Sequence, residues 1–590
     1  MALIVQKFGG TSVADSQKIL AAARKAIRAQ QEGNRIVMVV SAMGKNTDML
    51  VDLARQITDK PPAREMDMLL STGEQVSVAL MAMAIDSLGH KAVSLTGAQI
   101  GIRTDSTHTK ARIISISTER VGQLLDEGNI VIAAGFQGID ENLDITTLGR
   151  GGSDTTAVAL AAVLNGACEI YTDVDGVYTT DPRILPEARR VSRISYDEML
   201  ELASLGAGVM HNRSIEFAKK YNVPIHVRSS FTDEPGTIIV AQPESSKQVV
   251  CGAAVTKEEA RVTIIGVPDV PGTSLDFFSR IADRKITVDM IVQNIGEDGK
   301  ADVSFTVPRD ELALTLEAVQ ESVDLLGADG VTHDENVSKV SVVGLGMAKQ
   351  AGVADRMFRA LATAGINIQM ITTSEIKISA LVHRDEAHPA LRAIHNDFQL
   401  DEMPSEPTPA VEAAPPQAAD AAEVIARLRG MEELMIDDIS LDGSQARVTV
   451  AGVPDTPGLA ATVFEKIASA GIFIDMIVQG YGQDEQASVS FTVPQDQHDL
   501  AVSVGQELVK NLGCKGVSSS ASVAKLSVSG VGLRSHTGVA IRMFRALAKE
   551  SINVEMVNTS EVRVNVLVEG TKGEKALDCL QAAFADAVGR

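Results

Sequence analysis

Two patterns of hydrophobic and polar positions divide the chain. In the first, which covers residues 1–245, short β-branched runs alternate with longer segments whose apolar residues recur at helical spacing. This alternation is typical of a mainly parallel sheet covered by helices, so we predict an α/β domain. The runs expected to form strands are 3–6, 36–40, 91–95, 130–134 and 169–171, and the expected helices include 16–31 and 154–165.

Beyond the first domain, each unit reads strand, turn, helix and two further strands, and the units repeat. The twelve-residue sequence that begins at Arg261 recurs with few changes from Arg447, an offset of 186 residues. Segments from Val303, Met357 and Thr373 recur at the same offset, so the two copies are collinear. The two halves of each copy are weakly similar, which predicts four related modules. We number these modules first to fourth, over residues 260–332, 338–400, 445–517 and 523–590.

A segment rich in proline and alanine, residues 401–430, separates the second module from the third. Prolines among alanines and acidic residues are typical of a solvated, semi-extended tether. We therefore expect this segment to join the two copies without contributing chemistry.

Composition and charge narrow the class of protein. The chain has 590 residues, too many for one core, and 45% hydrophobic and 22% charged residues, as in soluble globular proteins. Its formal net charge of -23 argues against nucleic acid and anionic membrane as partners. Four scattered cysteines favour a reducing cytoplasm over a disulfide framework, and the absence of an uncharged apolar run of membrane-spanning length predicts no membrane span.

Three polar loops follow predicted strands and carry the candidate chemistry. The first is Lys7-Phe-Gly-Gly-Thr-Ser, in which Gly9 and Gly10 would let backbone N–H groups approach an anion and Lys7 would add a positive charge. It is not a P-loop, and a tight turn is the alternative interpretation.

The second loop is Thr147-Leu-Gly-Arg-Gly-Gly-Ser-Asp, which we expect to follow strand 130–134 and to lead into a helix. Arg150 would clamp a carboxylate, Ser153 would donate a hydrogen bond, and Asp154 would orient a lysine or a substrate ammonium. A helix N-cap at Ser153 or Asp154 is the alternative.

The third loop, from Thr172 to Arg183, is acidic and rich in hydroxyl groups. Its Asp-Gly and Asp-Pro pairs are also typical of ordinary turns. Ligands of α/β proteins bind where parallel strands end, so the three loops together predict one crevice for a nucleotide and an acid.

These loops, together with Leu70-Ser-Thr-Gly-Glu, resemble the aspartate kinases of the amino-acid-kinase superfamily, and the resemblance covers essentially the whole chain. The four modules resemble ACT domains, which are ferredoxin-like βαββαβ units that pair and bind amino acids. The resemblance implies a three-layer αβα catalytic domain followed by four ACT domains. It also implies that ATP with Mg²⁺ phosphorylates L-aspartate to 4-phospho-L-aspartate, the first step of lysine, threonine and methionine biosynthesis.

The resemblance further implies roles for individual residues, which we retain as expectations. The catalytic residues would be Lys7 and Asp154, and the substrate-binding residues would be Thr47, Glu74, Arg150 and Ser153. The ATP-binding residues would be Lys7, Phe8, Gly9, Gly10, Thr172, Asp173, Tyr178, Thr179, Asp181, Pro182 and Arg183. No metal-binding side chains are predicted.

Feedback by lysine, threonine or both is implied at the modules, along with a homodimer or higher oligomer formed through them. The effector residues of the first copy would be Asp269, Gly272, Gln293, Asn367, Ile368, Ser374 and Glu375. Those of the second copy would be Asp455, Gly458, Gln479, Asn553, Val554, Ser560 and Glu561. A module that only dimerises the enzyme is the alternative.

One position departs from the family, because Gly208 stands where many members have lysine. A nucleotide contact is then lost, or supplied by Lys219 or Lys220. His211 is expected to be an ordinary hydrogen-bonded histidine. Two other functions stay open: a related enzyme with another acceptor, such as glutamate, and an amino-acid sensor without activity.

Overall fold

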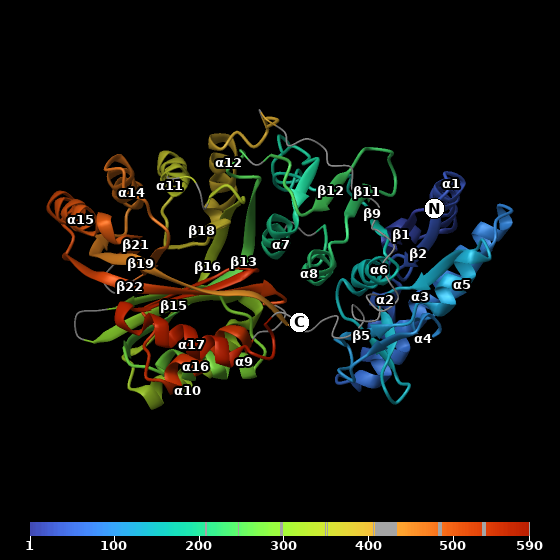
Figure 1. Ribbon diagram of the computed structural model, residues 1–590, viewed down its shortest axis with the longest axis horizontal. Helices are drawn as coiled ribbons and strands as arrows, with labels where there is room; N and C mark the ends of the chain where they lie inside the picture. The colour runs from blue at the N-terminus through green and yellow to red at the C-terminus, as the bar shows by residue number, and fades with distance from the viewer. Residues whose placement is uncertain are drawn as a thin grey trace.

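The computed structural model describes residues 1–206, 209–245, 247–295, 299–347, 350, 352–404, 406, 434–481, 486–533 and 538–588. Gly208 and residues 407–430 of the predicted linker therefore lie outside the described residues. In Figure 1 the N-terminal domain occupies the right of the molecule, in blue to teal, and the repeated modules occupy the left.

The N-terminal domain is built on a sheet with the strand order β10-β12-β11-β9-β1-β2-β6-β3. Its neighbours are parallel except for β11 and β12, which confirms the predicted α/β class. The strands are β1 (Leu3–Phe8), β2 (Arg35–Val40), β3 (Ala92–Leu95), β6 (Ile130–Ala134), β9 (Ala167–Thr172), β10 (Arg193–Ser195), β11 (Ile225–Ser229) and β12 (Thr237–Val240).

Helices cover both faces of this sheet because its central strands are apolar on both sides. In β2, Ile36 and Met38 belong to the core under α1 and α3, whereas Val37 and Val39 belong to the core that includes α6. The helices are α1 (Ser16–Gln31), α2 (Asn46–Ile57), α3 (Ala63–Ser87), α4 (Gly97–Ile100), α5 (Glu119–Asp126), α6 (Gly152–Val163), α7 (Tyr196–Ser204) and α8 (Asn212–Tyr221).

A small second sheet, in the order β5-β4-β7-β8, corrects one expectation. The second glycine loop does not follow strand 130–134 directly, because the hairpin of β7 and β8 lies between them. Strands of three residues carry too few positions to show a period of two, so the hairpin left no hydrophobic pattern. Its strands are β4 (Ile102–Thr104), β5 (Ile113–Ile116), β7 (Gln137–Ile139) and β8 (Ile145–Thr147).

The four modules share one sheet of twelve strands. Its strands are β13 (Gly252–Pro268), β14 (Asp289–Ile295), β15 (Lys300–Pro308), β16 (Gly330–Val343), β17 (Met370–Thr373), β18 (Lys377–His383), β19 (Met435–Pro454), β20 (Ile477–Tyr481), β21 (Gln486–Pro494), β22 (Gly516–Val531), β23 (Met556–Thr559) and β24 (Arg563–Glu569). The helices are α9 (Thr273–Asp283), α10 (Leu312–Leu326), α11 (Val353–Thr363), α12 (Ala387–Asp397), α14 (Leu459–Ser469), α15 (His498–Leu512), α16 (Gly538–Lys549) and α17 (Gly573–Ala583).

Two strands in each copy run through both of its modules. In the first copy, residues 259–265 of β13 pair with 330–337 of β16, and residues 252–256 pair with 339–343. The second module therefore takes a strand from a segment that precedes the first module in sequence. The strands β19 and β22 repeat this arrangement in the second copy.

The modules pair across the two copies rather than within one. The second and third modules join through β17 and β20, where Ile371 lies opposite Gln479. The first and fourth modules lie side by side through β14 and β23. Each pair has its own core, and Figure 1 shows α11, α12, α14 and α15 on one side of the strands and α9, α10, α16 and α17 on the other.

A fifth cluster of buried residues lies where the two pairs of modules meet. It contains Met290, Met370, Met476 and Met556, one from the same position of each module, and each is at most 2% exposed. Unbranched methionine side chains fill irregular gaps well, as the junction between the two pairs of modules requires.

Helix α3 has the length and apolar composition of a membrane span. It packs against α1, α2, β3, β6 and β8, and half of its most apolar window is buried. These contacts are those of a core helix of the N-terminal domain.

The N-terminal domain contacts the modules through α7 and α8, which face them in Figure 1. Glu201 of α7 is completely buried, and one of its carboxylate oxygens lies 3.0 Å from the ammonium of Lys377. Glu198, on the same helix, accepts a hydrogen bond from the backbone N–H of Leu345.

The pairing of the second and third modules can be tested at Phe358, which is fully buried and packs 5.1 Å from the Phe464 ring across the pair. We expect Phe358→Ala to lower the free energy of unfolding of the modules by about 3–5 kcal/mol. Because the chain has no tryptophan, urea unfolding is best followed by circular dichroism. Ile238→Ala, at a position 40% exposed, is the control, and an equal loss there would contradict the assignment.

Candidate active site

The first and third predicted loops begin at the carboxyl ends of β1 and β9, and the second, which follows β8, meets the first at the start of α6. Lys7 is the second-last residue of β1, and Asp154 lies in the first turn of α6. The Lys7 ammonium lies 2.6 Å from the Asp154 carboxylate. Both side chains are only about a tenth exposed. The structure thus brings the two residues predicted as catalytic into direct contact.

The first glycine loop is held close to its neighbours. Gly9 donates a backbone hydrogen bond to the carbonyl of Tyr171, at the end of β9. A Cβ atom at Gly10 would lie 2.7 Å from the carbonyl oxygen of Ala42, so no larger residue fits there. Beneath the loop, the rings of Phe8 and Tyr171 stack with centroids 4.6 Å apart.

The second glycine loop leads from β8 into α6. Gly149 and Gly151 have φ values of 76° and 69°, the left-handed region that favours glycine. A Cβ atom at Gly151 would also lie 2.3 Å from the Cβ of His211. Every residue of α6 is buried, whereas Arg150 is exposed in the loop before it. The N-terminus of a buried helix and an exposed guanidinium both favour an anionic ligand.

Glu74 lies in α3, beside this crevice, and has an incomplete set of partners. One carboxylate oxygen accepts the backbone N–H of Ala42, while the buried second oxygen, Oε2, has no hydrogen-bond partner. Burial raises the pKa of Glu74 to about 7, although the hydrogen bond from Ala42 works to lower it. Such an oxygen is suited to accept an ammonium from a ligand. Thr47, near the start of α2, is half-buried.

The third loop is partly engaged in contacts of its own. Arg183 forms an ion pair with Asp181, Tyr178 donates to Asp175, and Thr172 donates to Asp173. Pro182 is half-buried and Asp173 is exposed.

Thr179 differs from the rest of the third loop because it is fully buried against the second module. Its carbonyl accepts the N–H of Ala253, and its hydroxyl lies 3.0 Å from His395 Nε2. A direct contact between Thr179 and a nucleotide stays a prediction.

Several residues that support the loops were not predicted. Asp67 is completely buried and accepts hydrogen bonds from Thr147 and from the N–H of Thr109, while His108 Nδ1 lies 2.8 Å away. Its position as an acid within the apolar run Met66–Leu70 was the available signal. Arg213 donates to the carbonyls of Leu148 and Ala111, and no feature of the sequence indicated this role.

His211 is the N-cap of α8 and accepts a hydrogen bond from the backbone of Arg213, as expected for an ordinary histidine. Burial lowers its pKa, and the Arg213 and Arg150 cations act in the same direction. Lys219, considered as a substitute for the missing family lysine, pairs instead with Asp197.

The effector residues group differently from the two sets that we expected. Asp269 accepts hydrogen bonds from Gln293 of its own module and from Asn553 of the other copy. Likewise, Asn367 donates to Asp455. Each cleft therefore combines the two copies, because the modules of one copy are joined end to end by shared strands and cannot lie side by side.

A second kind of pocket has a different lining in each pair of modules. One, of about 130 Å³, is lined by residues that include Ser560, Glu561, Asp289 and Lys377. Its counterpart, of about 80 Å³, is lined by residues that include Ser374 and Glu375. By contrast, the cavity at Asn367 and Asp455 measures about 10 Å³, room for roughly one water.

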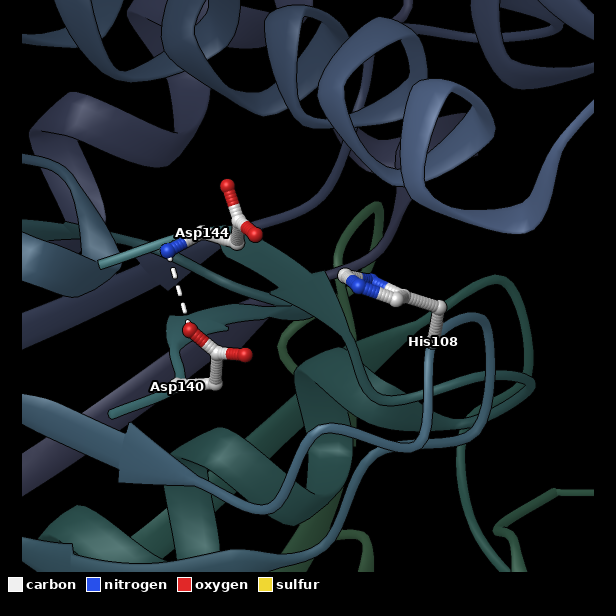
Figure 2. A group of neighbouring side chains, drawn as sticks. All are labelled: His108, Asp140 and Asp144. Carbon is white, nitrogen blue, oxygen red and sulfur yellow. Dashed lines mark hydrogen bonds between the residues drawn. The ribbon is translucent and has the colours of Figure 1, made fainter. Parts of the chain in front are cut away.

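His108, Asp140 and Asp144 form the one group of described residues whose ligand atoms lie close enough to share a metal ion. Figure 2 shows the N–H of Asp144 donating to Asp140 within this group. His108 contacts Asp67, and Asp144 pairs with Arg64. Although burial works to raise it, hydrogen bonds from Ser106, Asp144 and Asn142 hold the pKa of Asp140 below its usual value. These contacts account for the group without a metal ion.

Comparisons with known proteins agree with the fold. The amino acid kinase family model matches residues 2–229, and ACT domain models match residues 261–324, 340–398, 448–507 and 526–584. The aspartate kinase of Pseudomonas putida is 51% identical over 404 residues, which make up 68% of this chain and 98% of that protein.

Two solved structures are also similar. The aspartate kinase from Synechocystis is 40% identical and matches with a TM-score of 0.52 over 100% of this chain and 99% of that one. E. coli aspartokinase III, in complex with aspartate and ADP, is 26% identical, with a TM-score of 0.58 over 67% of this chain and 99% of that one. Its complex with lysine and aspartate gives a TM-score of 0.54 at the same identity and coverage.

The role of Asp67 can be tested by its removal. Asp67→Ala would leave buried donors of the loops 105–111 and 147–151 without an acceptor, so we expect a loss of about 2–4 kcal/mol in the free energy of unfolding. Asp67→Asn, which keeps one acceptor oxygen, should recover part of this loss. Urea unfolding checks the values, and exposed Asp86→Ala on the same helix should stay within about 0.5 kcal/mol of wild type. A loss at Asp86 as large as at Asp67 would contradict the role.

Proposed function

The chain belongs to the aspartate kinases of the amino acid kinase family, and from this premise we propose how its residues transfer the γ-phosphoryl group of ATP to L-aspartate. The reaction yields 4-phospho-L-aspartate and ADP. The attacking carboxylate is already ionised at neutral pH, so no general base is required. Catalysis then consists of positioning the two substrates and neutralising charge on the transferred group.

The contact between Lys7 and Asp154 carries this proposal. Lys7 stabilises negative charge on the phosphoryl group during transfer, together with the backbone N–H of Gly10. Asp154, 2.6 Å from the Lys7 ammonium, holds the lysine in position and keeps it from binding elsewhere. The first turn of α6 adds its own N–H dipoles to the same site.

The groups around the crevice complement aspartate. The unpartnered Glu74 Oε2 accepts the α-ammonium, and exposed Arg150 pairs with the α-carboxylate. Ser153 and Thr47 provide hydroxyl groups at the same crevice. The β-carboxylate is then left facing Lys7.

We assign ATP to the first and third loops, over Phe8, Gly9 and Gly10 and the segment from Thr172 to Arg183. Mg²⁺, when bound with the nucleotide, would neutralise charge on the phosphates, and Asp173 and Asp154 would be the carboxylates placed to hold it. The oxygen donors fit such an ion, because Asp173 is exposed in the nucleotide loop and Asp154 lies at the transfer site.

The two kinds of pocket differ in charge and suit different effectors. The pocket at Ser374 and Glu375 is also lined by Asp355 and Asp475, and its described lining has no lysine or arginine. Each of these acids pairs with a cation outside that lining, so a cationic ligand would have to compete with these ion pairs. The pocket suits a cationic amino acid such as lysine, which E. coli aspartokinase III binds in its T state. The sites at Asn367 with Asp455 and at Asn553 with Asp269 each present one amide and one carboxylate. The first has room for only about one water, so it would have to widen before a neutral effector such as threonine could bind.

An interaction between chains and a cytoplasmic location complete the proposal. Because the modules pair within one chain, a homodimer formed through them would use other faces than β17 and β20. The buried state of all cysteines except half-buried Cys579 fits a reducing compartment.

A different carboxylate acceptor is the competing function, and Glu74 with Arg150 argues for an α-amino acid.

The activity is tested by trapping the acyl phosphate as its hydroxamate, with ATP, Mg²⁺ and either L-aspartate or L-glutamate. We expect product from aspartate alone, and inhibition by lysine, threonine or both. Lys7→Ala should lower kcat by about 10²–10³ because a charge at the transfer site is lost. Lys91→Ala, at an exposed position, is the control. No product with wild-type enzyme, or an undiminished rate with Lys7→Ala, would contradict the proposal.

The raised pKa of Glu74 predicts a pH dependence. Below its pKa of about 7, the carboxyl group is mostly neutral and does not attract an ammonium, so kcat/KM for aspartate should rise between about pH 6 and 8 and level off above that. Glu74→Gln should be low throughout and lack this rise. An unchanged pH profile in that variant would assign the titration to another group.

A further inference from the structure

The first turn of α8 lies between the second glycine loop, which carries Arg150 and is called the aspartate-binding loop from here on, and the fourth module. Asn212, the first residue of the helix, donates a hydrogen bond of 2.9 Å from its side-chain amide to Glu561 Oε2. Asn212 is half-buried, and Glu561 is only 5% exposed. This hydrogen bond joins the catalytic domain directly to a regulatory module.

The residues on either side of Asn212 hold the aspartate-binding loop. The Arg213 guanidinium donates to the Leu148 carbonyl at 2.6 Å and to the Ala111 carbonyl at 2.7 Å. His211 packs closely on Gly151: a Cβ atom added to Gly151 would lie only 2.3 Å from the Cβ of His211. The loop that carries Arg150 is therefore clamped at both ends by neighbours of Asn212.

Glu561 is fixed from the other side as well. Its backbone N–H donates to Glu201 at 2.9 Å, and Glu201 pairs with Lys377 at 3.0 Å. Burial raises the pKa of Glu201, whereas the Lys377 ammonium opposes that rise. Because Glu561 also lines the pocket of the first and fourth modules, a ligand in that pocket lies against the same carboxylate that Asn212 uses.

The equivalent residue of the first copy has a different partner. Glu375 lies 186 positions before Glu561 and forms an ion pair with Arg563 of the fourth module. The duplication has thus given the same glutamate two roles, one between modules and one toward the catalytic domain.

We propose that Asn212 is a positioning residue for aspartate: its hydrogen bond to Glu561 ties the aspartate-binding loop to the fourth module. A ligand with an ammonium group in the pocket at Ser560 and Glu561 weakens aspartate binding, because it competes for the Glu561 carboxylate. This inference rests on the proposed function, since it assigns Arg150 to the aspartate carboxylate.

The test is a double-mutant cycle in the full-length enzyme, with Asn212→Ala, Glu561→Ala and both together. A hydrogen bond to a charged group contributes about 1.5–3 kcal/mol, so each single variant should raise KM for aspartate about tenfold or more. The KM for ATP should change less than twofold. The double variant should be no worse than either single variant, because both remove one contact. Glu561→Gln, which keeps an acceptor oxygen, should recover most of the affinity.

Two further arms separate this role from general loss of structure. Glu375→Ala, the matched change in the first copy, should raise KM for aspartate at least five times less than Glu561→Ala. With L-lysine and L-threonine as probes, Asn212→Ala should lose most of the effector-dependent increase in KM for aspartate. Circular dichroism identifies any variant that fails to fold, and Asn212→Gln serves as the conservative change at the same position.

The outcomes are distinguishable. Multiplicative effects of the two substitutions on KM, or equal effects at Glu375 and Glu561, would overturn the positioning role. So would an unchanged KM in Asn212→Ala while wild-type enzyme phosphorylates aspartate. Absence of aspartyl hydroxamate in the wild type would instead overturn the proposed function itself.

Discussion

A buried ion pair sets the position of the catalytic domain on its regulatory half. Glu201 and Lys377 come from different domains; Glu201 is completely buried and Lys377 is only 5% exposed. Such a pair adds little net stability, but separating its members would leave a buried charge without a partner, at a cost of several kcal/mol. The two halves are therefore confined to arrangements that keep the pair together. The nearby hydrogen bonds of Glu198 and Asn212 depend on that arrangement for their short distances.

The catalytic crevice follows from the parallel sheet. Parallel strands place their carboxyl ends along one edge, so loops far apart in the sequence converge there. Lys7 and Asp154 meet because β1 is central and α6 packs against it. The same geometry leaves Glu74 buried with one oxygen unpaired, a cost that the folded protein bears in the absence of ligand. The affinity proposed for aspartate and the pH dependence of its binding thus have a common origin in the burial of the Glu74 carboxyl group.

The sequence was sufficient for the α/β class and the repeat, because long apolar runs and a constant offset are strong signals. The family resemblance pointed to Lys7 and Asp154, which the structure brings into contact, while their catalytic role stays a prediction. It was insufficient for contacts between the copies. Nothing in the segment around Asn367 indicates that its partner is Asp455 rather than a residue of its own copy. The strands β7 and β8 were not predicted, because strands of three residues are too short to show a two-residue hydrophobic period. The contacts of Arg213 were not predicted, because no local sequence pattern indicates them. Thr179 was assigned to the nucleotide loop by resemblance, and nothing in the sequence indicated that its hydroxyl lies against His395 of the second module.

The pairing across copies has a consequence for how the enzyme responds to dilution. Where regulatory modules pair between separate chains, the population of complete clefts follows mass action and falls with protein concentration. Here β17 meets β20 within one covalent chain, so pairing is a unimolecular equilibrium with a fixed effective concentration. Sensitivity to effectors then becomes a property of each molecule, and a cell that holds few copies of the enzyme retains the same feedback as one that holds many.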